Sequence, residues 1–315
     1  MVAPRRLPQL DGRHMTSAGG FETWLQFVDG FKLRHFCGFE LLNDARGRAC
    51  LAAYHRGVVE AAVANGFGVI NEGLHYRASR DWGDLIGFSR EALEEINIRG
   101  IDFYKDFATE YGSPETPMIV GGVIGPRGDA YNVGRLPDST EAEDYHSEQI
   151  LTFKKAGADV VTAMTFSSVE EAIGVARAAR SAEMPVVISF LVAKGGKLKD
   201  GESLEEAISR VDLATDSAPA YYMINCTHPT EFEPGLTPGN WTGRLGGFLP
   251  NAVAMETLDL CKLGHLEDGD PDELAAQMAG LARRFPHVNV WGGCCGTDGR
   301  HIAQITRRVG EVRKS

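Results

Sequence analysis

Two adjacent cysteines, Cys294 and Cys295, lie among glycines in the segment 291–297, directly after the apolar run 288–290. Adjacent cysteines rarely close a strain-free disulfide with each other, and the flanking glycines let the backbone turn sharply with both sulfur atoms free on one side. Thiolates are ligands for soft metal ions such as zinc. Because two thiolates are an incomplete site, the pair predicts that another part of the chain supplies a third ligand.

Cys226 is the candidate third ligand, because it directly follows the apolar run 221–225. Three cysteine ligands leave one tetrahedral position of Zn²⁺ open, which is typical of catalytic zinc sites. A thiol that binds to zinc loses its proton and becomes a nucleophile at neutral pH. The three cysteines therefore predict a zinc site that binds a thiol acceptor for alkyl transfer. Cys37, Cys50 and Cys261 are interpreted as ordinary thiols.

Alternating helices and strands must position these cysteines. Strands are expected at 67–70, 118–123, 159–163, 185–190, 221–225, 246–250 and 288–290, and helices at 46–65, 89–111, 139–156, 168–182, 203–214, 271–285 and 299–312. This alternation predicts a parallel sheet, and about eight strands favour a single-domain α/β fold, a (β/α)8 TIM barrel over residues 1–315 with its core at roughly 14–313. An open doubly wound sheet is the alternative. No Gly-x-Gly-x-x-Gly follows the first strand to favour its dinucleotide-binding form.

The expected barrel would bring the ends of the strands at 221–225 and 288–290 to one rim, within reach of a single ion. Two local features are also predicted. Gly19 and Gly20 indicate a turn between a short strand and a loop, and Ser139 is the expected cap of the helix at 139–156.

Composition excludes several classes of function. The chain has 315 residues, 43% of them hydrophobic, and a net charge of −11. This acidic balance argues against nucleic-acid and anionic-membrane partners, and no 18 apolar residues run together. A cytoplasmic protein is expected, with its six cysteines present as thiols or metal ligands and not as disulfides. The oligomeric state does not follow from the sequence.

The chain resembles the homocysteine S-methyltransferases. The resemblance is carried by Asn225 with Cys226, by Gly-Gly-Cys-Cys-Gly-Thr at 292–297, by Gly-Gly-Phe-Glu-Thr at 19–23, and by the segments 76–82 and 122–128. It implies a (β/α)8 barrel that holds zinc through Cys226, Cys294 and Cys295. It also implies methyl transfer from a sulfonium or ammonium donor to homocysteine, which gives methionine. S-methylmethionine or S-adenosylmethionine is the first expectation for the donor and betaine the second, whereas methylfolate is not expected.

The resemblance, together with the expected strand ends, assigns the substrate site. Its predicted residues are Gly19, Gly20, Glu22, Thr23, Glu72, Tyr76, Met164, Asn225 and Thr297. The sequence departs from the family at two positions, where Ala18 and Met164 stand in place of an Asp and a Glu suited to bind the ammonium group of homocysteine. Glu22 or Glu72 is the expected replacement anion.

Three aromatic residues, Tyr76, Trp82 and Tyr131, are candidates either to face a cationic donor or to pack in the fold. Arg127 is a candidate for a substrate carboxylate or for a rim salt bridge.

Two alternatives to a homocysteine methyltransferase remain at this point. A divergent family member could act on a different thiol, or retain only metal and ligand binding, which the departures at Ala18 and Met164 would allow. The other alternative is a redox protein that uses Cys294 and Cys295. It ranks last, because these residues lack the Cys-x-x-Cys spacing of redox motifs.

Overall fold

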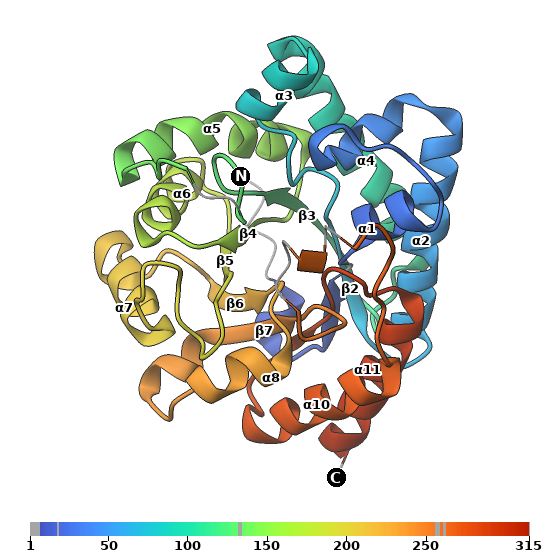
Figure 1. Ribbon diagram of the computed structural model, residues 1–315, viewed down its shortest axis with the longest axis vertical. Coiled ribbons are helices and arrows are strands. Elements are labelled where there is room, and N and C mark those ends of the chain that lie inside the picture. Colours follow the sequence, from blue (N-terminus) through green and yellow to red (C-terminus); the bar gives the residue numbers. More distant parts are fainter. Residues whose placement is uncertain (1–6, 18, 132–133, 256–258, 261–262, 315) are drawn as a thin grey trace.

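The computed structural model describes residues 7–17, 19–131, 134–255, 259–260 and 263–314. Within them, parallel strands form a closed barrel in sequential order, and β1 pairs with β8 through Met15 and Val290 (Figure 1). The strands are β1 (Met15–Ser17), β2 (Gly68–Asn71), β3 (Met118–Ile124), β4 (Val160–Phe166), β5 (Val186–Phe190), β6 (Tyr221–Asn225), β7 (Leu245–Leu249) and β8 (Val290–Trp291). The predicted (β/α)8 barrel is confirmed.

Helices surround the barrel in Figure 1. They are α1 (Phe21–Phe27), α2 (Ala45–Val63), α3 (Arg80–Ile86), α4 (Arg90–Tyr111), α5 (Ser139–Ala156), α6 (Val169–Ser181), α7 (Leu204–Thr215), α8 (Pro229–Phe232), α10 (Pro271–Arg284) and α11 (Gly299–Lys314). Short 3-10 turns lie at Pro8–Asp11, Arg34–Phe36, Gly38–Asn43, Glu233–Gly235 and Asn240–Arg244. Among the described residues, no helix has the length and apolar character needed to cross a bilayer.

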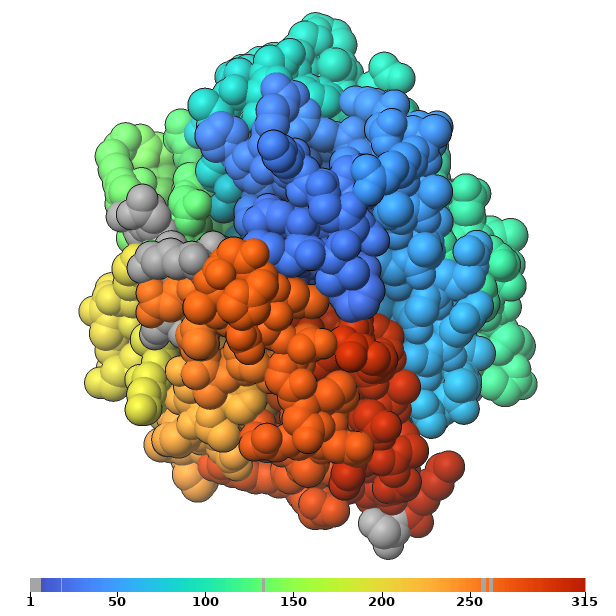
Figure 2. Space-filling view, turned by 45° about the vertical axis from the view of Figure 1, so that its right-hand side comes forward, coloured from blue at the N-terminus to red at the C-terminus, as the bar shows by residue number. Residues whose placement is uncertain are grey.

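Two apolar layers stabilise this arrangement. Side chains such as Met15, Ile70 and Met223 fill the inside of the barrel, and a larger cluster packs the outer faces of the strands against the helices. Every residue of β4 is buried, as expected for a strand covered on both sides. Figure 2 shows the N-terminal segments, in blue, directly beside the C-terminal ones, in orange and red. The site elements from both ends of the chain are thereby brought together.

The structure corrects the expectation for the segment after β1. Gly20 does adopt a left-handed turn (φ 62°), but the helix α1 follows it and not a loop. Phe21 and Leu25 are its buried residues, and their i, i+4 spacing places both on one face. Seven residues are too few for this periodicity to be recognised in the sequence. The helix α3 was not predicted for the same reason, and β8 lies one to two residues later than expected because it pairs with Gly247 and Phe248 of β7.

The cap of α5 also differs from the prediction. Asp138, and not Ser139, is the N-cap: its carboxylate accepts hydrogen bonds from the backbone N–H groups of Thr140 and Glu141, both at 2.9 Å. The Glu141 carboxylate in turn accepts from the backbone N–H of Asp138, at 3.3 Å, which completes a capping box.

We expect Asp138→Ala to lower the free energy of unfolding by about 1 kcal/mol, because two N–H groups of the first turn lose their partner. The matched control is Ser139→Ala at the next position, which should change this free energy by less than about 0.5 kcal/mol. Urea denaturation followed by circular dichroism measures both. Equal effects of the two substitutions would contradict the assignment of the cap.

Candidate functional site

The three predicted metal ligands meet at the carboxyl end of the barrel. Their sulfur atoms lie within 4.8 Å of one another. Cys226 follows β6 in a left-handed conformation (φ 57°), which turns the chain away from the strand immediately after Asn225. Cys294 and Cys295 follow β8. Three sulfur donors in one cluster suit a soft, tetrahedral ion, so the residues present fit zinc.

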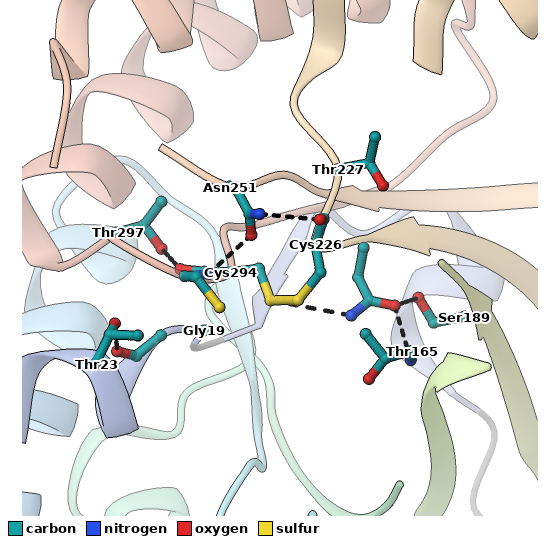
Figure 3. The surroundings of a disulfide bond; sticks show 12 residues. Gly19, Thr23, Thr165, Ser189, Cys226, Thr227, Asn251, Cys294 and Thr297 are labelled. Atoms are coloured by element: carbon teal, nitrogen blue, oxygen red, sulfur yellow. Dashed lines mark hydrogen bonds between the residues drawn. A yellow bond between two sulfur atoms is a disulfide. The ribbon is translucent and has the colours of Figure 1, made fainter. Parts of the chain in front are cut away.

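The oxidation state of the cluster departs from the prediction. The structure joins Cys226 to Cys294 by a disulfide (Figure 3), with their Cα atoms 5.4 Å apart, and Cys295 takes no part in this bond. The prediction of thiols or metal ligands without disulfides is therefore wrong for this pair. The physical reason is proximity, because cysteines placed close enough to share one ion are also close enough to bond to each other. Reduction of the disulfide yields three thiols at the same place.

The side chain of Asn251, just beyond β7, connects the two cysteine-bearing segments. Its Nδ2 donates to the backbone oxygen of Cys226 at 2.9 Å, and its Oδ1 accepts from the backbone N–H of Cys295 at 3.2 Å (Figure 3). The backbone N–H of Cys294 donates to the oxygen of Pro250 at 2.7 Å. Asn251 is 1% exposed. The ends of β6, β7 and β8 are thus held in one geometry by a buried amide.

Asn225 lies under the cluster. Its Oδ1 accepts hydrogen bonds from the backbone N–H of Thr165 at 3.0 Å and from the hydroxyl of Ser189 at 2.7 Å. Its Nδ2 therefore points to the sulfur of Cys294, at 3.9 Å. Thr165 has a left-handed backbone (φ 64°), which is strained for a β-branched residue and is supported here by the Asn225 amide. Asn225 is one of the predicted substrate-site residues, and in the structure its amide contacts the sulfur of Cys294.

The N-terminal glycine motif packs against the cysteine segment. A Cβ atom at Gly19 would lie 1.6 Å from the backbone oxygen of Gly293, so no other residue fits there without displacing the segment. Thr23 accepts a hydrogen bond from the backbone N–H of Gly296 at 3.3 Å, and Thr297 donates to the backbone oxygen of Cys294 at 2.7 Å. Thr297 is 2% exposed and lies behind the segment. These contacts support the cysteines from the side of β1.

A cavity of about 340 Å³ opens over the cluster. All the predicted site residues except Thr297 line it: Gly19, Gly20, Glu22, Thr23, Glu72, Tyr76, Met164, Asn225, Cys226, Cys294 and Cys295. Aromatic and aliphatic side chains supply much of the remaining wall, including Phe21, Phe27, Phe36, Tyr131 and Leu249. Of the two family departures, Met164 is in this wall and 9% exposed, whereas Ala18 lies outside the described residues. The cavity therefore combines a sulfur cluster with a mainly apolar lining.

Glu22 and Glu72 are two of the acidic residues that line this cavity. Glu72 is 1% exposed, and its carboxylate accepts hydrogen bonds from the hydroxyls of Ser17 at 2.8 Å and Thr162 at 2.6 Å. Burial raises the pKa of Glu72 to about 7, although these two hydrogen bonds oppose the shift. Burial likewise raises the pKa of Glu22 to about 8, against a lowering by its own backbone N–H and by Arg77. Neither carboxyl group forms an ion pair with another described residue, and a bound cation would favour the ionised form of either one.

Of the aromatic and cationic candidates, two line the cavity. The Tyr76 hydroxyl hydrogen-bonds with that of Thr165 at 2.7 Å, and the Tyr131 hydroxyl donates to the sulfur of Cys226 at 3.4 Å. Trp82 instead stacks under the guanidinium of Arg77, 4.1 Å from its ring centroid.

Arg127 pairs with the Asp81 carboxylate at 2.9 Å, at partly exposed positions outside the cavity lining. The rim salt bridge is therefore the correct one of the two interpretations of Arg127.

Sequence reasoning missed Asn251 and the pair Ser17 and Thr162. Asn251 was detectable, because it follows the expected strand at 246–250 and so lies at a carboxyl end like the cysteines. Ser17 and Thr162 gave no such signal. Their role depends on the facing position of Glu72, which lies 55 and 90 residues away from them in the chain.

We expect Asn251→Asp to weaken binding of Co²⁺ or Zn²⁺ to the reduced protein by about 10- to 100-fold, because the donor to Cys226 is lost and the loops are no longer held together. Cobalt titration followed by its thiolate charge-transfer absorption gives the affinity. Asn97→Asp is the matched control, since Asn97 is also buried but donates to Ala78 and Leu93, outside the site. Equal metal affinity in the two variants would contradict the role of Asn251.

Comparisons with known proteins identify the family. The model of the homocysteine S-methyltransferase family matches residues 18–309. The methionine synthase of Mycobacterium tuberculosis is 27% identical over 98% of this chain, and that of Mycobacterium leprae is 27% identical over 96%. The chain spans about a quarter of the length of these relatives, 26% and 25% respectively.

Among solved structures, the metallated form of the homocysteine methyltransferase MmuM from Escherichia coli has a TM-score of 0.75 at 17% identity, and covers 96% of this chain and 98% of its own. The oxidized form of that protein has a TM-score of 0.75 at 16% identity, and covers 94% and 96%. These structures share the fold of the present barrel. On the match to residues 18–309, the chain belongs to the homocysteine S-methyltransferase family.

Proposed function

We propose that this protein is a zinc-dependent methyltransferase that moves a methyl group from a sulfonium donor to homocysteine, giving methionine. S-methylmethionine and S-adenosylmethionine are the preferred donors, and betaine is the second choice. The observation that carries the proposal is the cluster of Cys226, Cys294 and Cys295 within 4.8 Å, open to a cavity of about 340 Å³. Family membership supports the same reaction class.

Zinc held by these three cysteines would bind the acceptor's sulfur as a thiolate at neutral pH. The chain must first present three thiolates, so the Cys226–Cys294 disulfide has to be reduced. A cytoplasmic location, which we include in the proposal, would keep it so. In the transfer, a new carbon–sulfur bond forms to the acceptor while the bond from the methyl carbon to the donor's cationic centre breaks. The acceptor thiol releases its proton to solvent when it becomes a thiolate, and the donor leaves as a neutral thioether or amine, so the transfer needs no oxidant, reductant or separate base.

Glu72 is proposed as the partner of homocysteine's ammonium group. The hydroxyls of Ser17 and Thr162 fix its orientation, and its pKa near 7 allows a bound cation to shift it to the ionised form. In a water-poor cavity such a pairing is stronger than at the surface. Glu72 would thus replace the carboxylate that the family usually has at the position of Met164. Glu22, with a pKa of about 8, is the second candidate.

A second function is favoured by one observation. Met164 lies in the cavity wall at the position of a family carboxylate, which suits an acceptor thiol without an ammonium group, or a protein that retains only metal and ligand binding. Thermal shifts of the zinc-loaded protein with homocysteine, with simple thiols and with sulfonium donors distinguish these cases. Stabilisation by simple thiols alone would favour a different acceptor, and no stabilisation by any compound would favour loss of the activity.

We expect the reduced protein to keep about one zinc ion per chain after dialysis, and to convert homocysteine to methionine with at least one of the sulfonium donors. Cys226→Ser should lose both the metal and the reaction, whereas the control Cys50→Ser, a free cysteine outside the cluster, should keep both. Metal analysis and mass spectrometry of the product are the measurements. Retention of zinc by Cys226→Ser would contradict the proposal.

The apparent affinity for homocysteine should depend on Glu72. Above about pH 7 this carboxyl group is ionised in the free protein and pairs with the ammonium group, and below that pH its protonation weakens binding. We expect Glu72→Gln to raise the KM for homocysteine about tenfold at pH 8. The difference in KM between this variant and wild type should become smaller as the pH falls to about 6, because Glu72 of the wild type is then protonated. Glu22→Gln is the comparison. If only Glu22→Gln shows this pattern, Glu22 is the partner and the assignment to Glu72 is wrong.

A further inference from the structure

A second cavity, of about 170 Å³, adjoins the first at the carboxyl ends of β4 to β6. Tyr131 and Cys226 line both cavities, so they form the wall between them. The other lining residues are Ala130, Ser167, Leu191, Val192, Ala193, Lys194, Lys199, Thr227, Glu231 and Met255. The proposed function assigns no role to this space, although one of the three metal ligands borders it.

The charged groups of the second cavity differ in sign from those of the first. Two ammonium groups, of Lys194 and Lys199, and one carboxylate, of Glu231, line the second cavity, which leaves an excess of positive charge. The first is lined by the carboxyl groups of Glu22, Glu72, Asp129 and Glu267 against the guanidinium of Arg77. In a chain of net charge −11, the first cavity therefore attracts cationic groups and the second attracts anionic groups.

The two lysines are carried by a segment of defined shape after β5. Lys197 forms antiparallel bridges with Ala193 and with Ser203. Lys194 lies in the turn that the first bridge closes, and Lys199 lies in the turn that the second closes. The ammonium group of Lys199 donates to the backbone oxygen of Tyr131 at 3.3 Å. Among the described residues, the ammonium group of Lys194 has no ion pair or hydrogen bond. Lys194 is therefore available to an anion, next to a lysine that already contacts the shared wall.

We propose that the second cavity binds the carboxylate of the methyl donor, through Lys194 and Lys199, while the cationic end of the donor lies at Tyr131 beside Cys226. The inference rests on the proposed function and narrows its donor to a compact onium compound that carries a carboxylate. The Tyr131 ring can face a cation, and the two lysines can pair with an anion. A single molecule that carries both charges can therefore contact the ring and the lysines at the same time. A space of about 170 Å³ suits a short acid, because pockets for drug-sized ligands usually hold about 300–1,000 Å³.

The methyl transfer is the same for a donor bound in this way. The methyl carbon leaves the donor's sulfonium or ammonium centre and bonds to the acceptor thiolate, and the electron pair of the broken bond stays on the donor. The carboxylate takes no part in the chemistry and serves only to orient the donor. Loss of its partners should therefore raise the donor's KM and leave kcat unchanged.

The test compares the Lys194→Gln/Lys199→Gln variant with wild type, using zinc-loaded, reduced protein. Donors that carry a carboxylate, S-methylmethionine and betaine, are compared with trimethylsulfonium, which has none. We expect the KM of the active carboxylate-bearing donor to rise about tenfold or more in the double variant, with kcat and the KM for homocysteine unchanged. The KM for trimethylsulfonium should stay at its wild-type value. Lys197→Gln is the matched control, because Lys197 lies between the two turns but not in the cavity lining.

An unchanged KM for the carboxylate-bearing donor, or an equal rise for trimethylsulfonium, overturns the inference. If no donor supports turnover, the proposed function fails, and calorimetric titration with S-methylmethionine and betaine then decides the inference separately. Binding of either compound that the double variant weakens about tenfold and Lys197→Gln does not would support the cavity assignment. Absence of binding to wild type, or binding that is equal in all three proteins, would overturn it.

Discussion

The buried amide of Asn251 is the interaction on which the arrangement of the site depends. It bonds at once to the backbone oxygen of Cys226 and to the backbone N–H of Cys295, so the segments after β6 and β8 cannot move independently. An unpaired polar group at a 1% exposed position would be costly, about 1–3 kcal/mol, which makes both bonds persist. The fold's own contacts therefore hold the three sulfur atoms within 4.8 Å of one another.

The closed barrel makes this arrangement possible. All its strands are parallel, so their carboxyl ends lie on one rim, and residues far apart in the chain become neighbours there. Close packing then determines which residue types fit. Gly19 touches the backbone of Gly293 so closely that a Cβ atom has no room, and Asn225 supports both the strained Thr165 and the sulfur of Cys294. The cluster is held from β1, β4 and β7 as well as by its own strands.

Burial controls the electrostatics of the site. The same apolar wall that raises the pKa values of Glu22 and Glu72 also strengthens the pairing of either carboxylate with a cation. The second cavity has the opposite excess charge, because of Lys194 and Lys199. Two spaces of different charge on either side of Tyr131 and Cys226 offer separate places for an acceptor and a donor. The transfer would then take place at their shared wall.

Most of the strands and helices, the barrel and the cysteine cluster could be predicted from the sequence alone, whereas the short helices α1 and α3 could not. Apolar periodicity is local, and the rule that strand ends converge turns local assignments into a shared rim for Cys226, Cys294 and Cys295. Only the tertiary structure decided the contacts between distant residues. It determined the hydrogen bonds of Glu72 with Ser17 and Thr162. It also determined the ion pair between Arg127 and Asp81 and the disulfide between Cys226 and Cys294. These contacts depend on which side chains face each other across the barrel, and no spacing along the chain encodes that.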